Sequence, residues 1–188
     1  MGLDMYAHRR LYTKQWKHQK DDERYTVEVA RAGKPVAGFQ PERISGVEAE
    51  VMYWRKANQI HGWMVKHVQN KQDDCKQYHV DFETLSYLLE DCKKVIESSK
   101  LVDGMITNGE TYNSKTRTWE PRCEPGRVIE DSTVAQAVLP TTQGFFFGHY
   151  EYDEDYLGDV IATHNWLERM IHDYNKGVPG DIYYSSSW

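Results

Sequence analysis

The stretch Tyr53-Trp54-Arg55-Lys56-Ala57-Asn58-Gln59-Ile60-His61-Gly62-Trp63-Met64-Val65-Lys66-His67-Val68 contains no proline and repeats apolar residues at three- and four-residue intervals. This interval is typical of an amphipathic helix, because it brings the apolar side chains onto one side. The sequence therefore predicts a central helix over 53–68. Its apolar stripe, which we expect in the core, consists of Tyr53, Ala57, Ile60, Met64 and Val68.

A second face of this predicted helix is polar and aromatic. Trp54, Asn58 and His61 fall at positions i, i+4 and i+7, and Arg55 and Gln59 lie on the next row. Such a face either holds a ligand or pins neighbouring loops, since buried polar side chains usually serve the structure. The sequence leaves both interpretations open.

Two further helices are predicted. Asp81 is a candidate N-cap for a helix over 82–99, in which apolar residues repeat at helical spacing. The other helix covers 155–175 and follows a group of acids, which suit the positive end of a helix dipole.

Strands are predicted from alternating or β-branched runs between turn signals. The run Gly144-Phe145-Phe146-Phe147-Gly148 predicts a buried strand over 144–150, because glycines bracket three phenylalanines. Turn-rich sequence over 101–132 predicts a β-hairpin excursion with its tip near residues 113–115. The other predicted strands or extended segments are 2–12, 25–30, 43–52, 78–80 and 181–188.

Together these elements predict one α+β domain over residues 1–188, with three main helices on one face of a mainly antiparallel sheet. A length of 188 residues is enough for one well-buried core. Charged residues make up 28% of the chain, the net charge is -6, and the basic residues are spread out. A surface for duplex nucleic acid is therefore not expected, because phosphates demand a concentrated cationic face.

Three cysteines, Cys75, Cys92 and Cys123, are odd in number and widely spaced, so we expect free thiols and a reducing cytoplasm. The first residues contain an early acid and no apolar run, so a secretory signal is not expected. No segment has the length and apolarity of a membrane span, so no membrane partner is expected. A homo-oligomer is left open.

Known catalytic signatures are missing from the sequence: there is no GxSxG, HExxH, phosphate-binding glycine loop or paired-cysteine motif. We therefore assign no catalytic residue, metal ligand or cofactor. One cluster of acids either holds magnesium in a hydrolase or nuclease site or simply begins a helix. Its members are Glu151, Asp153, Glu154, Asp155 and Asp159.

Aromatic residues are unusual in kind, with 13 Tyr and 6 Trp against 5 Phe. Such rings supply stacking faces, and the polar residues of the second helix face supply donors to phosphate, ribose or base edges. The combination predicts a site for a small nucleotide-like ligand. The predicted ligand-binding residues are Trp54, Arg55, Asn58, Gln59, His61, Tyr152, Tyr183, Tyr184 and Trp188.

Four blocks of the chain resemble a family of uncharacterised bacteriophage and prophage proteins. They are Met1–Tyr6, Tyr53–His61, Gly144–Gly148 with Tyr152–Glu154, and Tyr183–Trp188. These blocks span nearly the whole chain apart from 101–132. The resemblance implies viral origin and the host cytoplasm as location, and it assigns no reaction.

Viral origin and a nucleotide-like site together lead to the hypothesis that the protein sequesters a host nucleotide signal used in antiviral defence. A metal-dependent hydrolase or nuclease acting through the acids of 151–159 is the first alternative. The second is a protein that binds and inhibits a host protein through its aromatic surface.

Overall fold

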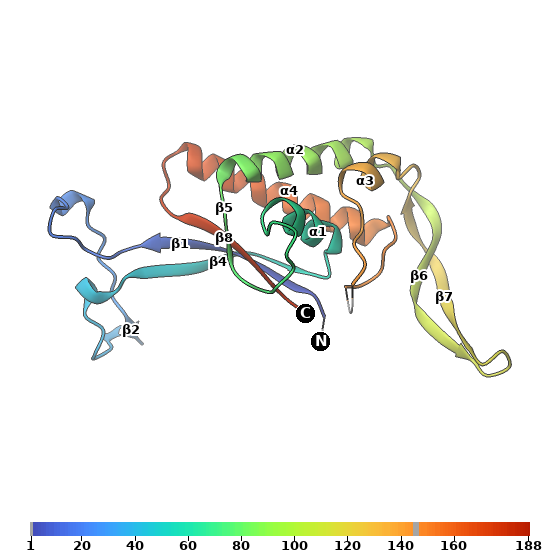
Figure 1. Cartoon of the computed structure of the whole chain (residues 1–188), viewed down its shortest axis with the longest axis horizontal. Helices are drawn as coiled ribbons and strands as arrows, with labels where there is room; N and C mark the ends of the chain where they lie inside the picture. Colours follow the sequence, from blue (N-terminus) through green and yellow to red (C-terminus); the bar gives the residue numbers. More distant parts are fainter. Residues whose placement is uncertain (1, 145–146) are drawn as a thin grey trace.

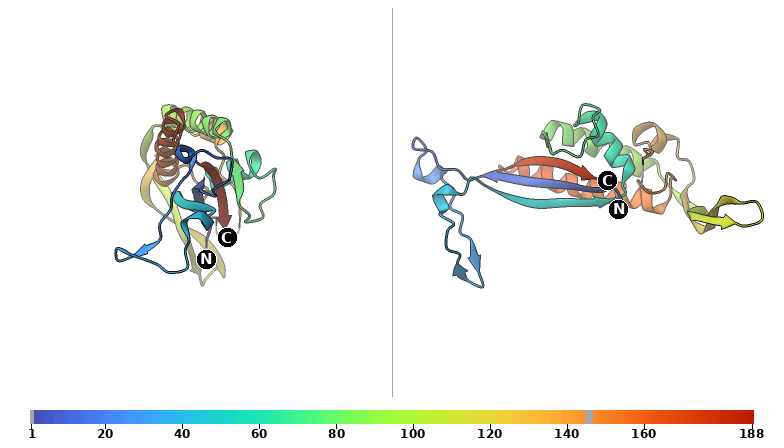
Figure 2. Two further views of the ribbon diagram at one scale, coloured as in Figure 1. Left: turned by 90° about the vertical axis from the view of Figure 1, so that its left-hand side faces the viewer. Right: turned by 60° about the horizontal axis from the view of Figure 1, so that its bottom comes forward.

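The computed structural model describes residues 2–144 and 147–188, and its helices lie on one face of an antiparallel sheet (Figure 1). Figure 2 shows the same layering from two other sides. The predicted α+β class is thereby confirmed. In spatial order the strands of this sheet are β4 (Gly46–Arg55), β1 (Asp4–Tyr12), β8 (Asp181–Ser187) and β5 (Tyr78–Val80).

The two long helices, α2 and α4, lie side by side above the sheet (Figure 1). Asp81 caps α2 as predicted, because its carboxylate accepts a hydrogen bond from the Thr84 amide at 2.7 Å. The predictions of helices over 82–99 and 155–175 are confirmed to within a residue. The helices of the described residues are α1 (Asn58–His67), α2 (Phe82–Ser98), α3 (Thr133–Val138) and α4 (Glu154–Asn175).

The core lies between the sheet and these helices. Alternation along β1 turns Met5 and Ala7 inward, both at most 1% exposed. Across from them, Trp54 of β4 meets Trp166 of α4 edge to face, with ring centroids 5.3 Å apart. The strand and helix periodicities therefore bury one continuous apolar cluster.

The predicted helix over 53–68 is wrong in its first turn. Strand β4 continues through Tyr53, Trp54 and Arg55, which pair with β1, and α1 begins only at Asn58. The same side chains satisfy a strand pattern, with Trp54 buried and Tyr53 42% exposed on the opposite face. Pairing with β1 satisfies the backbone and outweighs the weak helical propensity of these aromatic residues.

The predicted strand over 144–150 is also wrong for its described part. Residue 144 and residues 147–150 form an irregular loop, and the other two phenylalanines lie outside the described residues. Phe147 is buried as expected, at 5% exposure. Its carbonyl, however, bonds to a side chain of α1 and not to a neighbouring strand.

Two segments extend from opposite ends of this body (Figure 1). At one end the predicted hairpin is confirmed as β6 (Leu101–Asn113) and β7 (Thr118–Ile129). At the other end lies an excursion over 13–45, with two 3-10 turns at Asp21–Glu23 and Pro41–Arg43. The predicted strand over 25–30 is reduced there to a short ladder between β2 (Ala30–Arg31) and β3 (Lys34–Pro35).

Candidate functional site

The corner between β4 and α1 positions the first group of candidate residues. Arg55 ends the strand, and Lys56 turns the chain with a positive φ of 63°. Gly148 of the 141–149 loop lies so close that an added Cβ would stand 3.1 Å from the Lys56 Cβ. Gly148 itself has φ +95°, a conformation that glycine adopts without strain. The loop can therefore pack directly against this corner.

Asn58, the first residue of α1, ties the 141–149 loop to the helix. Its amide nitrogen donates to the carbonyls of Phe147 at 3.1 Å and His149 at 2.9 Å. Its amide oxygen accepts a hydrogen bond from the Thr142 amide at 2.9 Å. The side chain is 2% exposed, so these three bonds take the place of hydrogen bonds to water for Asn58 and for the main chain of the loop.

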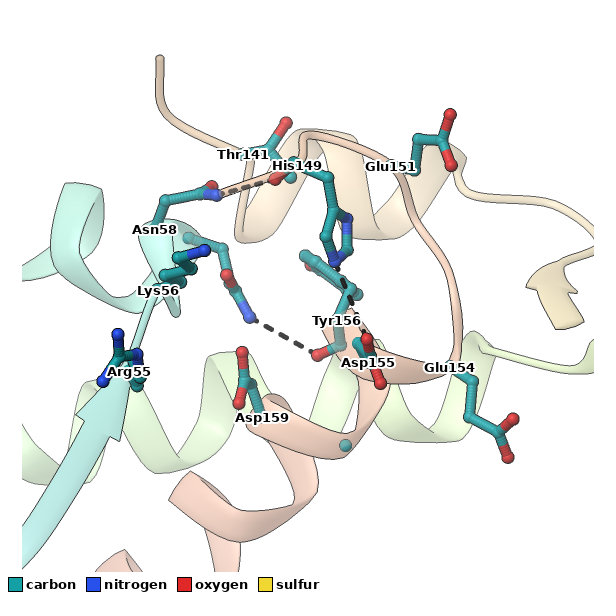
Figure 3. A pocket seen from close by; sticks show the side chains of 12 residues that line it. Arg55, Lys56, Asn58, Thr141, His149, Glu151, Glu154, Asp155, Tyr156 and Asp159 are labelled. Carbon is teal, nitrogen blue, oxygen red and sulfur yellow. Dashed lines mark hydrogen bonds and ion pairs between the residues drawn. The ribbon is translucent and has the colours of Figure 1, made fainter. Parts of the chain in front are cut away.

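Beside this corner lies a cavity of about 620 Å³, here called the polar cavity (Figure 3). Arg55 and Lys56 lie on one side of it, while Asp155 and Asp159 of α4 lie across from them. On the same side as Asp155, the ring of His149 points from the loop towards the Asp155 carboxylate (Figure 3). The cavity therefore combines cations at one end with carboxyl groups at the other.

Asp159 of α4 lines the polar cavity with a carboxyl group whose pKa is raised. Burial raises the pKa of its carboxyl from 3.8 to about 6; a hydrogen bond from Gln59 partly offsets this, and nearby Asp155 adds to the rise. Around pH 6 this carboxyl therefore changes from a group that can donate a hydrogen bond to one that only accepts. The His149 ring nitrogens lie 3.5 Å from the Asp153 carboxylate and 3.8 Å from that of Asp155.

A second cavity of about 530 Å³, here called the aromatic cavity, lies along the other side of α1, and among the described residues it shares no lining residue with the first. His61, Phe147 and Trp188 contribute rings to its lining. The Phe147 ring stands edge-on to His61, at 5.1 Å, and lies 6.2 Å from Trp188. Lys66 and Lys71 supply its cations.

His61 is fully buried behind this cavity and uses both ring nitrogens. Nδ1 lies 2.8 Å from the Tyr184 hydroxyl, and Nε2 lies 3.0 Å from the Asp73 carboxylate. The other oxygen of Asp73 accepts a hydrogen bond from the Trp188 indole at 3.0 Å. Neither nitrogen of His61 is free for a substrate, so this geometry argues against a general base here.

The structure does not bring the nine predicted site residues together. Arg55, Asn58 and Gln59 line the polar cavity, whereas His61 and Trp188 line the aromatic cavity. The other four residues lie elsewhere: Trp54 and Tyr184 in the core, Tyr183 under the Arg10 guanidinium, and Tyr152 against Tyr156.

The acids of 151–159 also divide their roles. Asp153 caps α4 by accepting the Tyr156 amide at 3.0 Å, Glu151 accepts the Thr107 amide at 2.8 Å, and Glu154 pairs with Arg127. Over residues 2–144 and 147–188, no three His, Cys, Asp or Glu side chains gather as a metal site would require. Asp153, Glu154 and Asp155 therefore lie at the start of α4, as the helix-start interpretation expects, whereas Glu151 and Asp159 do not.

Sequence reasoning missed three residues of the aromatic cavity, Asp73, Lys66 and Lys71. Asp73 lies in a polar run that resembles a solvated loop, and no local pattern connects it with a histidine 12 positions earlier. His149 was likewise unmarked, because only the loop geometry aims it at the polar cavity.

No protein-family model, curated protein or solved structure matches this chain. The resemblance to phage proteins therefore stays a prediction. Within the described part of the chain, no helix has the length and apolarity that crossing a bilayer requires.

Proposed function

We propose that the protein binds a small phosphorylated ligand of nucleotide type in the polar cavity. The observation that carries this proposal is the placement of Arg55 and Lys56 opposite the carboxyl groups of Asp155 and Asp159. A nucleotide has matching ends, with a phosphate at one and hydroxyl or amino donors at the other. The cavity volume of about 620 Å³ is within the range of small-molecule sites.

Arg55 is available for a phosphate. Its side chain is 60% exposed, and its ion pair with Asp4 is long, at 3.9 Å. A guanidinium offers two parallel N–H donors to phosphate oxygens, and Lys56 adds a second positive charge from the next position. These two groups set the phosphate end of the proposed site.

The opposite end of the polar cavity recognises donors. Asp155 accepts hydrogen bonds from hydroxyl or amino groups, while Asp159 either accepts or donates according to pH. Asn58 donates to main-chain carbonyls of the loop, and Gln59 donates to the Tyr156 carbonyl and to the Asp159 carboxyl, so both side chains shape the wall. Recognition in this proposal rests on hydrogen bonds and charge and not on stacking.

The central test is Arg55→Ala, studied by calorimetric titration with mono-, di- and cyclic nucleotides and by thermal melting. We expect binding to weaken by about 1.5–3 kcal/mol, because one charge-assisted contact is lost, while the fold is retained. Arg169→Ala is the matched control, since Arg169 is exposed on α4 outside the cavity. Equal affinity of the Arg55 variant and the parent, or no binding by the parent, would contradict the proposal.

The fate of the ligand separates a binding protein from an enzyme. The protein is incubated with the bound nucleotide and magnesium, then denatured, and the released compound is analysed. Sequestration of a nucleotide signal, the role that we favour, requires intact ligand. Conversion that Asp159→Asn abolishes would instead make the polar cavity an active site.

A further inference from the structure

The aromatic cavity has a wall that is held in place by hydrogen bonds. The C-terminal Trp188 is 50% exposed, yet its indole N–H is bound to Asp73. Asp73 is in turn bound to His61, which is fully buried and bound to Tyr184. This chain of bonds fixes the Trp188 ring at the cavity while leaving half of its surface open.

Lysine side chains outnumber carboxylate side chains in the described lining of the same cavity. Asp73 is the only acid among its described lining residues, and both of its oxygens are already used. Lys66 and Lys71 are exposed, and no ion pair joins either of them to a carboxylate of the described chain. Two uncompensated cations therefore stand beside open aromatic surface.

We propose that the aromatic cavity is a second ligand site, which takes a flat aromatic ring carrying an anionic group. The ring packs against Trp188 and Phe147, and the anion is met by Lys66 and Lys71. The angle of 66° between the two rings forms a corner, so a flat ligand that stacks on one meets the other edge-on. His61 contributes no hydrogen bond to this ligand, because both of its nitrogens are occupied.

This site goes beyond the function proposed for the polar cavity and does not depend on it. Over residues 2–144 and 147–188, the two linings have no residue in common. Each cavity therefore has its own variant: Arg55→Ala for the polar cavity, and Lys66→Gln with Lys71→Gln for the aromatic one. Glutamine removes the charge and keeps most of the side-chain length.

Phenyl phosphate is the probe, and its binding is followed through the indole N–H signals of the protein in NMR spectra. Trp188→Phe assigns the signal of Trp188. We expect the chemical shift of that signal to change saturably with phenyl phosphate. The dissociation constants of inorganic phosphate, which lacks the ring, and of benzyl alcohol, which lacks the anion, should be at least about tenfold higher. The Lys66→Gln, Lys71→Gln double variant should raise the dissociation constant about tenfold or more.

The matched control is Lys17→Gln with Lys93→Gln, two exposed lysines outside the cavity, which should leave the dissociation constant unchanged. Arg55→Ala should leave it unchanged as well. The proposal is overturned if the Trp188 signal shows no saturable movement. It is also overturned if Arg55→Ala abolishes the movement while the double lysine variant does not, because the probe would then occupy the polar cavity.

Discussion

Asn58 and Arg55 lie three positions apart and face the same cavity, but they differ in what their polar atoms do. Asn58 is 2% exposed, and its side chain makes three hydrogen bonds, all to the main chain of one loop. Arg55 is 60% exposed on its side chain, and its contacts with Asp4, a long ion pair, and with Tyr53 leave it open to solvent. A polar residue at a cavity is thus available to a ligand only when the fold has left its atoms unused.

The largest effect is expected for Asn58→Ala, which removes the three hydrogen bonds between α1 and the 141–149 loop. Two carbonyls and one amide lose their partner, and we expect the free energy of unfolding to fall by about 3–4 kcal/mol. Denaturant unfolding measures the loss. Asn165→Ala, an exposed change on α4, serves as control and should be nearly neutral. A loss for Asn58→Ala no larger than that control would mean that the loop is held by other contacts.

The pH dependence of Asp159 tests whether the polar cavity really buries a carboxyl. Its pKa is about 6 in the folded protein and 3.8 when unperturbed, so the folded state binds the extra proton between these values. Stability from this group is therefore present below pH 4 and is lost as pH rises towards 6, by about 2–3 kcal/mol in total.

Asp159→Asn removes that titration. We expect the variant to gain stability relative to the parent as pH rises from 4 to 7, in melts recorded at constant ionic strength. A difference between the two proteins that is the same at every pH would show that the carboxyl is solvated in the folded state.

The smallest effect is expected for Trp54→Phe, which concerns a predicted site residue that the structure places in the core. The indole N–H donates to the Thr163 hydroxyl at 2.8 Å, and the ring is 3% exposed. Losing that bond and some packing should lower the free energy of unfolding by about 1–2 kcal/mol. Nucleotide affinity should stay the same in calorimetric titration, and a drop in affinity without a drop in stability would return Trp54 to the site.

The sequence predicted correctly those elements that are recognisable from local patterns alone, such as an apolar stripe, a capping residue or a cluster of turn residues. The stripe of α2, with Asp81 before it, needs no distant partner to be recognised, and neither does the turn-rich hairpin of β6 and β7. By contrast, the end of β4 was mistaken for helix, since Trp54 and Tyr53 satisfy both patterns until pairing with β1 decides between them.

The candidate site was predictable in its residue types but not in its grouping. Asn58 and His61 were rightly marked as strong hydrogen-bonding groups on α1, yet their partners come from 142–149 and from Asp73 and Tyr184. No local spacing encodes those encounters, because they arise from how the loop and the last strand return to the helix. The split of one predicted site into two cavities follows from this.

The place of β8 in the sheet bears on how the chain is made. Strands β1 and β5 do not pair with each other; each pairs with β8, the last strand in the sequence. While the ribosome is still adding residues, the sheet has a gap that only residues 181–187 can fill. The helices can form locally during synthesis, but β1 must wait for translation to reach β8, because its residues pair from Arg10 with Asp181 to Asp4 with Ser187.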